Sequence, residues 1–175
     1  MSQEFIITMT ARNRVGILSS VTRAMSELGG DLREASQTVV RGYFTMIFSA
    51  EFPDNLDEEI VRDHLLDACR PFEIELTFNI PTRETHAEPA APVRLHVLRL
   101  GGDNQPGILR QLSALISMQG IDITGMNAVR ARQGGGFEMI MKVAVPETLN
   151  TDEFLRELNS TGRSFNITAD LSHHS

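Results

Sequence analysis

Two short segments carry the residue types best suited to binding chemistry: Asn13–Gly16, which reads NRVG, and Asn104–Gly107, which reads NQPG. Each segment is expected to join a strand to a helix. The first N–H groups of a helix have no intrahelical acceptor and carry the positive end of the helix dipole, so a carboxylate can bind there without a basic side chain. A glycine in the turn has no Cβ and lets a ligand approach the main chain closely. A purely structural role also fits these residues, because glycine and asparagine are common turn formers.

Two side chains make the second segment suitable for a zwitterion. Asn104 can both donate and accept hydrogen bonds, which suits the amino and carboxyl groups of an amino acid. Asp122 begins the strand expected after the helix, and its carboxylate could take an ammonium group. In the first segment, Asn13 and Asp31 occupy the corresponding positions.

The motifs of common enzyme classes are missing from the sequence. It contains no G-x-S-x-G elbow, no G-x-x-x-x-G-K-[ST] loop and no C-x-x-C or H-E-x-x-H pair. His64 and Cys69 lie on one expected helix but about 140° apart around its axis, so they cannot form a catalytic dyad. Cys69 is interpreted as a small buried hydrophobe, and His173 and His174 as part of a frayed terminus. We therefore expect no enzyme activity, no cofactor and no bound metal.

The two segments belong to a duplicated unit. Aligning Gly16 with Gly107 gives six identical pairs over 17 positions, about five more than average residue usage would give. Allowing a two-residue insertion, Phe44–Pro53 (FTMIFSAEFP) then aligns with Phe137–Pro146 (FEMIMKVAVP). Between the copies runs Pro81–Pro92 (PTRETHAEPAAP), which is typical of an extended linker. The sequence therefore predicts a first domain at residues 1–80, a linker at 81–92 and a second domain at 93–175.

Hydrophobic periodicity predicts the same order of elements in both copies. In the first copy we expect strand Phe5–Met9, a helix from Gly16 to Gly29-Gly30 with Leu18 on its apolar face, strands Thr38–Val40 and Tyr43–Glu51, a helix capped by Asp57 with Ile60 on its apolar face, and strand Phe72–Ile80. In the second copy we expect strand Leu95–Leu100, helix Ile108–Gln119, strands Ile123–Arg132 and Phe137–Val145, a helix capped by Asn150 and ended by Gly162, and strand Phe165–Leu171. This order predicts an α+β fold of two ferredoxin-like βαββαβ domains in tandem.

Composition and charge exclude several partners. The chain has 175 residues, of which 41% are hydrophobic, and a net charge of −7. Residues 1–80 carry −6 (7 Arg against 13 Asp and Glu) and residues 93–175 carry 0 (8 Arg and Lys against 8 Asp and Glu), so neither copy has the basic surplus that nucleic acid binding requires. No apolar run is long enough to span a membrane. The single cysteine, Cys69, indicates a reducing compartment, and we expect a cytoplasmic protein.

The segment DNQPGIL, followed after the helix by GIDI, resembles the motif of ACT domains, which are ferredoxin-like modules that sense amino acids. RNRVGIL with GGDL is a second, less complete instance. Two such domains in one chain are similar to the glycine cleavage system transcriptional repressor family. The resemblance implies a small amino acid ligand, glycine or serine above all, bound where ACT domains pair. It also implies a homodimer and a protein partner such as a transcription factor.

The resemblance assigns ligand contacts to both copies. In the second copy they are Asn104, Gln105, Pro106, Gly107, Ile108 and Asp122, and in the first copy they are Asn13, Gly16, Ile17 and Asp31. The first copy departs from the family pattern, because Val15 replaces the proline and Arg12 stands where the second copy has Asp103. The two sites are therefore not expected to be equivalent.

These observations favour a non-enzymatic regulatory protein that binds an amino acid. The alternative is a ligand-independent protein-interaction module on the same fold, whose exposed sheet edges could pair with a partner strand. An RNA-binding role on this fold is disfavoured, since it needs exposed aromatic and basic residues on the sheet and Lys142 is the only lysine in the chain.

Overall fold

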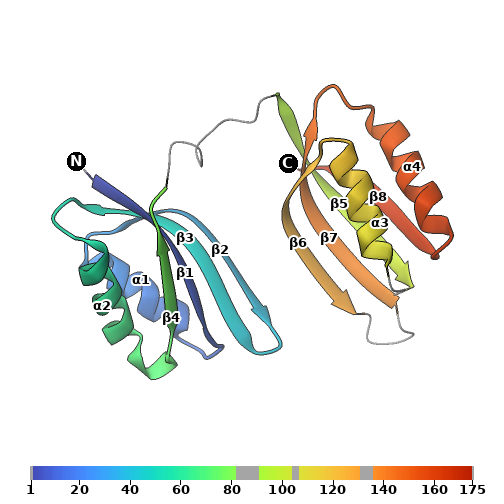
Figure 1. The fold of residues 1–175 in the computed structure, drawn as a ribbon. Helices are drawn as coiled ribbons and strands as arrows, with labels where there is room; N and C mark the ends of the chain where they lie inside the picture. The colour runs from blue at the N-terminus through green and yellow to red at the C-terminus, as the bar shows by residue number, and fades with distance from the viewer. Residues whose placement is uncertain (1, 82–90, 104–106, 131–135, 175) are drawn as a thin grey trace. The chain divides into compact units, whose positions relative to one another are not determined.

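The computed structural model describes residues 2–81, 91–103, 107–130 and 136–174 (Figure 1). The chain divides into two compact units, Met1–Ala87 and Glu88–Ser175. The predicted linker, residues 81–92, falls almost entirely outside the described residues, and its boundaries stay a prediction.

Unit 1 has the order βαββαβ with one additional 3-10 turn. Its elements are β1 (Ser2–Arg12), α1 (Ile17–Glu27), β2 (Asp31–Val40), β3 (Tyr43–Pro53), α2 (Glu58–Ala68), the 3-10 helix η1 (Arg70–Phe72) and β4 (Glu75–Asn79). The strands form one antiparallel sheet in the order β2-β3-β1-β4, and both helices lie on one face of it (Figure 1).

Unit 2 repeats this plan. Its elements are β5 (Val93–Asp103), α3 (Ile108–Met118), β6 (Asp122–Arg130), β7 (Gly136–Pro146), α4 (Thr151–Arg163) and β8 (Ile167–His173), and the strand order is β6-β7-β5-β8. The predicted fold of two ferredoxin-like units is confirmed.

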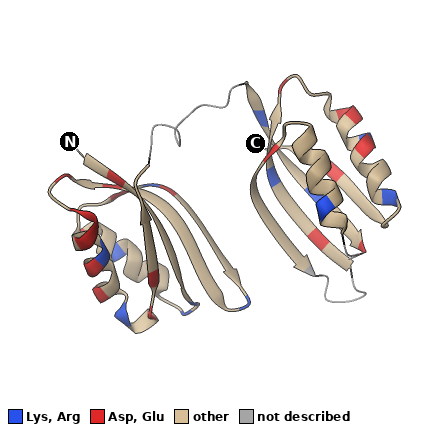
Figure 2. Cartoon of the chain, viewed as in Figure 1, with Lys and Arg blue, Asp and Glu red and all other residues tan. Residues whose placement is uncertain are grey.

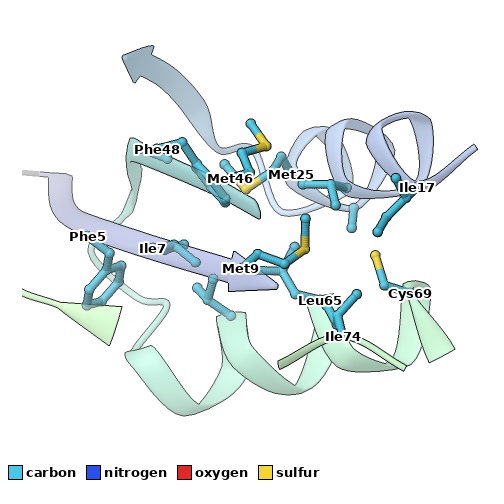
Figure 3. Close-up of a cluster of buried hydrophobic side chains, with 14 of the residues drawn as sticks. Phe5, Ile7, Met9, Ile17, Met25, Met46, Phe48, Leu65, Cys69 and Ile74 are labelled. Carbon is cyan, nitrogen blue, oxygen red and sulfur yellow. The ribbon is translucent and has the colours of Figure 1, made fainter. Parts of the chain in front are cut away.

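The core of unit 1 lies between the sheet and its helices (Figure 3). Along β1, every second side chain from Phe5 to Ala11 is buried, as expected for a strand with one covered face. From the helices, Ile17, Val21 and Met25 of α1 and Val61 and Leu65 of α2 contribute to this core. Leu18, which was predicted to share that apolar face, is instead 44% exposed. The covered stripe of α1 is therefore narrower than the sequence suggests.

Side chains cap the second helix of each unit. Asp57 accepts a hydrogen bond from the N–H of Ile60 at 2.9 Å, and Asn150 accepts from the N–H groups of Asp152 and Glu153 at 3.1 and 3.2 Å. Both predicted N-caps are confirmed. Ile60 itself was predicted to be buried but is 45% exposed, whereas the next residue, Val61, is fully buried in the core.

Two predictions at the end of unit 2 are wrong. Gly162 does not end its helix but lies buried inside α4, where an added Cβ would be 2.8 Å from the main-chain oxygen of Ile167. His173 is not part of a frayed terminus, because it pairs with His96 as the last residue of β8. Close packing of α4 on β8 explains the glycine, and strand pairing explains the histidine.

The outer strands β4 and β8 are covered by side chains from the helices. Asn159 on α4 donates to the carbonyl of Ala169 at 3.0 Å and accepts from its N–H at 2.9 Å. On unit 1, Arg62 of α2 donates to the carbonyl of Leu76 at 3.3 Å, and its guanidinium lies 4.6 Å from the ring centre of Phe78. These contacts protect two edges that could otherwise pair with other strands.

Acidic residues gather on the solvent-facing side of α2, which carries Glu58, Glu59, Asp63 and Asp67 (Figure 2). Within the described part of the chain, no helix combines the length and apolar character needed to cross a membrane.

Candidate ligand-binding site

The turn between β1 and α1 is built around Gly16. This residue is the N-cap of α1 with φ 96° and ψ −8°, a left-handed conformation that glycine adopts without the steric cost of a Cβ. No side chain caps the helix, and nothing among the described residues accepts a hydrogen bond from the N–H groups of Leu18 and Ser19. The turn therefore presents main-chain donors at the positive end of the helix dipole.

Neighbouring elements hold this turn on two sides. The N–H of Asn13 donates to the carbonyl of Gly42, in the hairpin between β2 and β3, at 2.8 Å. The guanidinium of Arg14 donates to the carbonyl of Pro71 in η1 at 3.0 Å. Val15, between these anchors and the helix, is fully exposed. The turn is thus fixed at its base while its tip is accessible.

A hollow of about 400 Å³ lies beside this turn. It is formed by the end of β1, the first residue of β3 and the segment from η1 to the start of β4. Its lining residues are Thr10, Ala11, Arg12, Tyr43, Phe72, Glu73 and Glu75. Phe72 also borders the turn, because its Cζ atom lies 3.7 Å from the position that a Cβ of residue 16 would take.

The hollow contains charges of both signs. Thr10 pairs with Glu75, and continuing that register places Glu73 opposite Arg12. Among the described residues no ion pair joins Arg12 to Glu73 or Glu75, so its guanidinium is available to a ligand. One cation facing two carboxylates is the arrangement that suits an α-amino acid, whose carboxylate and ammonium groups are close together.

Unit 2 repeats the backbone of the turn. Gly107 is the N-cap of α3 with φ 87° and ψ −11°, and among the described residues, its chain neighbours aside, no atom lies within 4 Å of the position that its Cβ would take. Asn104, Gln105 and Pro106 lie outside the described residues, so their predicted ligand contacts stay predictions.

The side chains around the second turn differ from those of the first. Gly102 pairs with Ile167, and the same register places Asn166 opposite Asp103, as Glu73 lies opposite Arg12. Asn166 and Glu73 also share a left-handed backbone, with φ 55° and 51°. In unit 2, however, the amide of Asn166 donates to the carboxylate of Asp103 at 2.9 Å. In unit 2 a hydrogen bond therefore joins the two positions that in unit 1 hold the separated charges of Arg12 and Glu73.

Comparison with known proteins identifies the family. Residues 5–68 match the ACT domain family model. Over 67 residues the chain is 37% identical to the UPF0237 protein of Methanosarcina acetivorans, a match that covers 38% of this chain and 73% of that protein. The chain belongs to the ACT-domain family. A second relative, the UPF0237 protein of Methanosarcina mazei, is 42% identical over 57 residues, which are 32% of this chain and 62% of that protein.

Two solved structures share the fold of this ACT-domain protein over the whole chain. The crystal structure of an unknown protein from Galdieria sulphuraria has a TM-score of 0.81 at 20% identity, with 100% of both chains covered. A protein described as a glycine cleavage system transcriptional repressor has a TM-score of 0.69 at 12% identity, covering 100% of this chain and 99% of that one. At these identities the similarity shows a shared fold.

Within an ACT unit, the predicted aspartates lie far from the turns. Asp31 pairs with Glu51, which in turn pairs with Glu4, whereas the turn follows Arg12 eight residues further along β1. At about 3.3 Å per residue the separation is roughly 26 Å. Asp122, paired with Ala144, has the corresponding position in unit 2. One unit therefore does not bring either aspartate together with its own turn.

Asp31 also has a partner of its own. Its carboxylate lies 3.4 Å from the guanidinium of Arg33, which donates to Glu51 at 2.5 Å. The hydrogen bond with Glu51, followed by the charges of Glu51 and Asp31, raises the pKa of Arg33. These residues form a small exposed charge network at the end of the sheet opposite the turn.

The predicted isoleucines contribute to the cores of the ACT units. The side chains of Ile17 and Ile108 are both buried, so only their main chains are accessible to a ligand at the turn. Their role in positioning the turn is to fix the first residue of each helix against the sheet.

Sequence reasoning missed the residues that distinguish the two ACT sites. Glu73 and Asn166 lie more than 60 positions from Arg12 and Asp103, respectively, and no motif marks them. The signal that could have found them is the pairing of the first and last strands in a βαββαβ unit, which places the residue before the last strand beside the end of the first.

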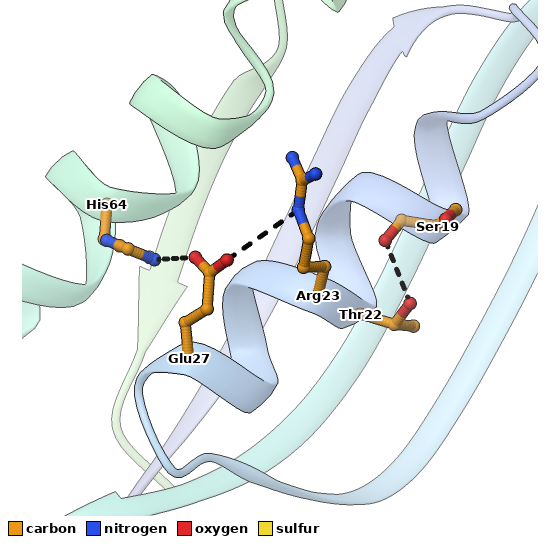
Figure 4. A network of polar contacts seen from close by, with 5 residues as sticks. All are labelled: Ser19, Thr22, Arg23, Glu27 and His64. Atoms are coloured by element: carbon orange, nitrogen blue, oxygen red, sulfur yellow. Dashed lines mark hydrogen bonds and ion pairs between the residues drawn. The ribbon is translucent and has the colours of Figure 1, made fainter.

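His64 and Cys69 do not form a reactive pair. His64 lies 2.9 Å from the carboxylate of Glu27, which also lies 3.8 Å from Arg23 within α1 (Figure 4). Cys69 is buried in the core, and burial raises the pKa of its thiol, with a smaller opposing effect from Arg23. The buried role predicted for Cys69 agrees with this position.

Proposed function

We propose that this ACT-domain protein is a non-enzymatic regulator that binds a small amino acid beside the β1–α1 turn and thereby controls a protein partner. Membership of the ACT family and the duplicated left-handed glycine turn support this proposal. The regulated process is transcriptional or metabolic, and glycine cleavage is the first to test because of the predicted resemblance to its repressors.

The observation that carries the proposal is the hollow of unit 1. Arg12 supplies a cation for the ligand's carboxylate, and Glu73 and Glu75 supply acceptors for its ammonium group. Tyr43 and Phe72 provide apolar walls for a side chain. The N-terminus of α1 adds a positive partial charge nearby. The site thus recognises the two groups that all α-amino acids share.

Unit 2 offers a poorer site of the same kind. It keeps the glycine turn, but it has Asp103 in place of the cation and commits this carboxylate to Asn166. A carboxylate ligand would meet a negative charge there. We therefore propose that unit 1 binds the amino acid more tightly, although its sequence motif is the less complete one.

Binding in the hollow would act on the position of η1 relative to the end of β1. The ligand would touch Arg12 at the end of β1 and Glu73 just after η1, and the Arg14–Pro71 hydrogen bond now joins the β1–α1 turn to η1 beside them. A ligand shifts a conformational equilibrium only by its different affinity for the two states. A protein partner that contacts the turn or η1 would bind the two conformational states with different affinities.

Calorimetric titration of the full chain tests the proposal. The ligands are glycine, serine, and the branched-chain and aromatic amino acids, because the hollow is larger than glycine alone requires. We expect saturable binding that Arg12→Gln weakens at least tenfold, since removing one charged hydrogen-bond partner typically costs about 1.5–3 kcal/mol. Glu73→Asn introduces the residue that unit 2 has at the equivalent position, Asn166, and asparagine tolerates the left-handed backbone found there. This substitution should also weaken amino acid binding.

The matched control is Arg110→Gln, which removes an exposed arginine from α3 in unit 2 and should leave binding unchanged. Absence of binding for all twenty amino acids at millimolar concentration would refute the proposal.

A second candidate function is ligand-independent binding of a protein partner. It is favoured by β2, an edge strand whose ten residues are all exposed. A partner retained from cell extract with the same affinity in the presence and absence of every amino acid would select this alternative.

A further inference from the structure

Two histidines in unit 2 lie directly opposite each other on neighbouring strands. His96 of β5 pairs with His173 of β8, and their ring centres are 4.5 Å apart with the planes tilted by 36°. The adjacent pair, Leu95 and His174, is hydrogen-bonded, with the N–H of His174 donating to the carbonyl of Leu95 at 3.1 Å. Because antiparallel pairs alternate, His96 and His173 form a non-hydrogen-bonded pair, the type whose side chains are closest.

One hydrogen bond of His96 indicates which nitrogen of its neutral ring donates. Its Nδ1 lies 3.2 Å from the carbonyl oxygen of Arg94. A carbonyl oxygen can only accept, so Nδ1 carries the proton and donates. In the neutral ring, Nε2 then keeps its lone pair. Histidines that bind metals have this same arrangement, in which one ring nitrogen donates to a carbonyl and the other is free to bind the ion.

His173 completes the arrangement from the solvent side. His96 is only 5% exposed, whereas His173 is exposed on the outer strand of the sheet. An ion can therefore approach from solvent and find one rigidly held imidazole and one that can rotate toward it. Arg94, two residues before His96, forms an ion pair with Glu147 at 3.2 Å.

We propose that His96 and His173 bind one divalent transition-metal ion of the kind that prefers imidazole, such as Zn²⁺, Ni²⁺ or Cu²⁺. The described residues contain no group of three or more His, Cys, Asp or Glu side chains suited to a metal, so water would supply the remaining positions. Two protein ligands make this an exchangeable site. By bridging β5 and β8, the ion would fasten the last strand of unit 2 to its sheet.

This proposal is independent of amino acid binding in unit 1. It is tested by titrating the full chain with Zn²⁺ in chelator-free buffer, with binding followed by calorimetry and stability by thermal unfolding. We expect one ion per chain and a rise in melting temperature, because an ion that binds only the folded state stabilises it. His173→Gln should weaken binding at least tenfold and abolish the rise.

His174→Gln is the matched control. His174 directly follows β8 and continues its pairing with β5 through the Leu95 carbonyl, so strand alternation predicts that its side chain faces away from His96 and that its loss changes the affinity less than twofold. Three outcomes would overturn the proposal: no stoichiometric binding, wild-type affinity in His173→Gln, or an equal loss in His174→Gln or His64→Gln. Copper-induced broadening of the histidine ring NMR signals gives a second measurement, and it should affect His96 and His173 first.

Discussion

At the scale of single residues, two adjacent glycines in β5 have different constraints. A Cβ on Gly102 would lie 2.2 Å from the main-chain oxygen of Asn166 and 2.8 Å from the Cα of Ile167. A Cβ on Gly101 would meet nothing closer than 3.9 Å. The end of β5 and the start of β8 therefore approach each other closely. This approach requires the absence of a Cβ at Gly102 but not at Gly101.

We accordingly expect Gly102→Ala to destabilise unit 2 by at least about 2 kcal/mol, because neither backbone atom can move aside cheaply. Gly101→Ala should change its stability by less than about 1 kcal/mol. Urea titrations followed through the amide NMR signals of unit 2 measure both values. Equal stability of the two variants would contradict the observed approach of the strands.

Cys69 provides a probe of unit 1. Its thiol is buried and burial raises its pKa, so the reactive thiolate is disfavoured in the folded state. We expect a thiol reagent at pH 8 to label the native chain at least about 100-fold more slowly than the urea-unfolded chain, since labelling requires opening of the core. Fast labelling of the native chain would show that the core is open to solvent.

The raised pKa of the Cys69 thiol also makes the stability of unit 1 depend on pH. Because the folded-state pKa of Cys69 exceeds the ordinary value of 9.0, its stabilising effect is complete below pH 9 and is lost as pH rises through the folded-state pKa. Unfolding midpoints of the wild type and Cys69→Ala should therefore converge above pH 9. A constant difference from pH 7 to 11 would argue against this thiol as the cause.

At the scale of elements, most strands and helices could be predicted because each has one apolar face. The alternation from Phe5 to Met9 and the run from Ile17 to Met25 show the two periods clearly. Their boundaries were less predictable. β2 begins at Asp31, seven residues before the predicted Thr38, because an edge strand needs no apolar pattern when its side chains are exposed.

Asn159 shows an element-level interaction that no sequence pattern reveals. In the β5–β8 ladder, Leu100 and Ala169 form a non-hydrogen-bonded pair, so the N–H and C=O of Ala169 point toward the free edge. The side-chain amide of Asn159 forms hydrogen bonds with both of these groups. The side chain thus takes the place of a neighbouring strand at this position.

We expect Asn159→Ala to lower the stability of unit 2 by about 1–3 kcal/mol and to accelerate amide hydrogen exchange at Ala169. Asn159→Asp should retain partial protection, since a carboxylate still accepts from the Ala169 N–H. Asn127→Ala on the exposed strand β6 is the control. Unchanged exchange at Ala169 in Asn159→Ala would contradict the role of this side chain.

At the scale of the whole molecule, the internal repeat was the most informative feature of the sequence. Aligning Gly16 with Gly107 was enough to predict two copies of one fold, and both glycines have the left-handed conformation that such a turn requires. The difference between the copies could not be predicted in the same way. It depends on which residues folding places opposite Arg12 and Asp103, and on whether they form a hydrogen bond there. The predicted homodimer and the identity of the partner stay predictions.

The duplicated fold therefore contains two similar turns with different chemistry beside them. Unit 1 combines its turn with separated charges in a hollow, while unit 2 closes the corresponding place with the Asp103–Asn166 hydrogen bond. The duplicated backbone thus carries a cation and two carboxylates beside the turn of unit 1, and a carboxylate bonded to an amide beside the turn of unit 2.

The most direct test of the central claim is a titration of the ¹⁵N-labelled full chain with the amino acid that binds most tightly, followed by two-dimensional NMR. The amides of Arg12, Gly16 and Glu73 in unit 1 are expected to shift together with one saturation curve, and those of Asp103, Gly107 and Asn166 to shift less. Saturable shifts confined to other parts of the chain, or no shifts with any amino acid, would contradict the claim.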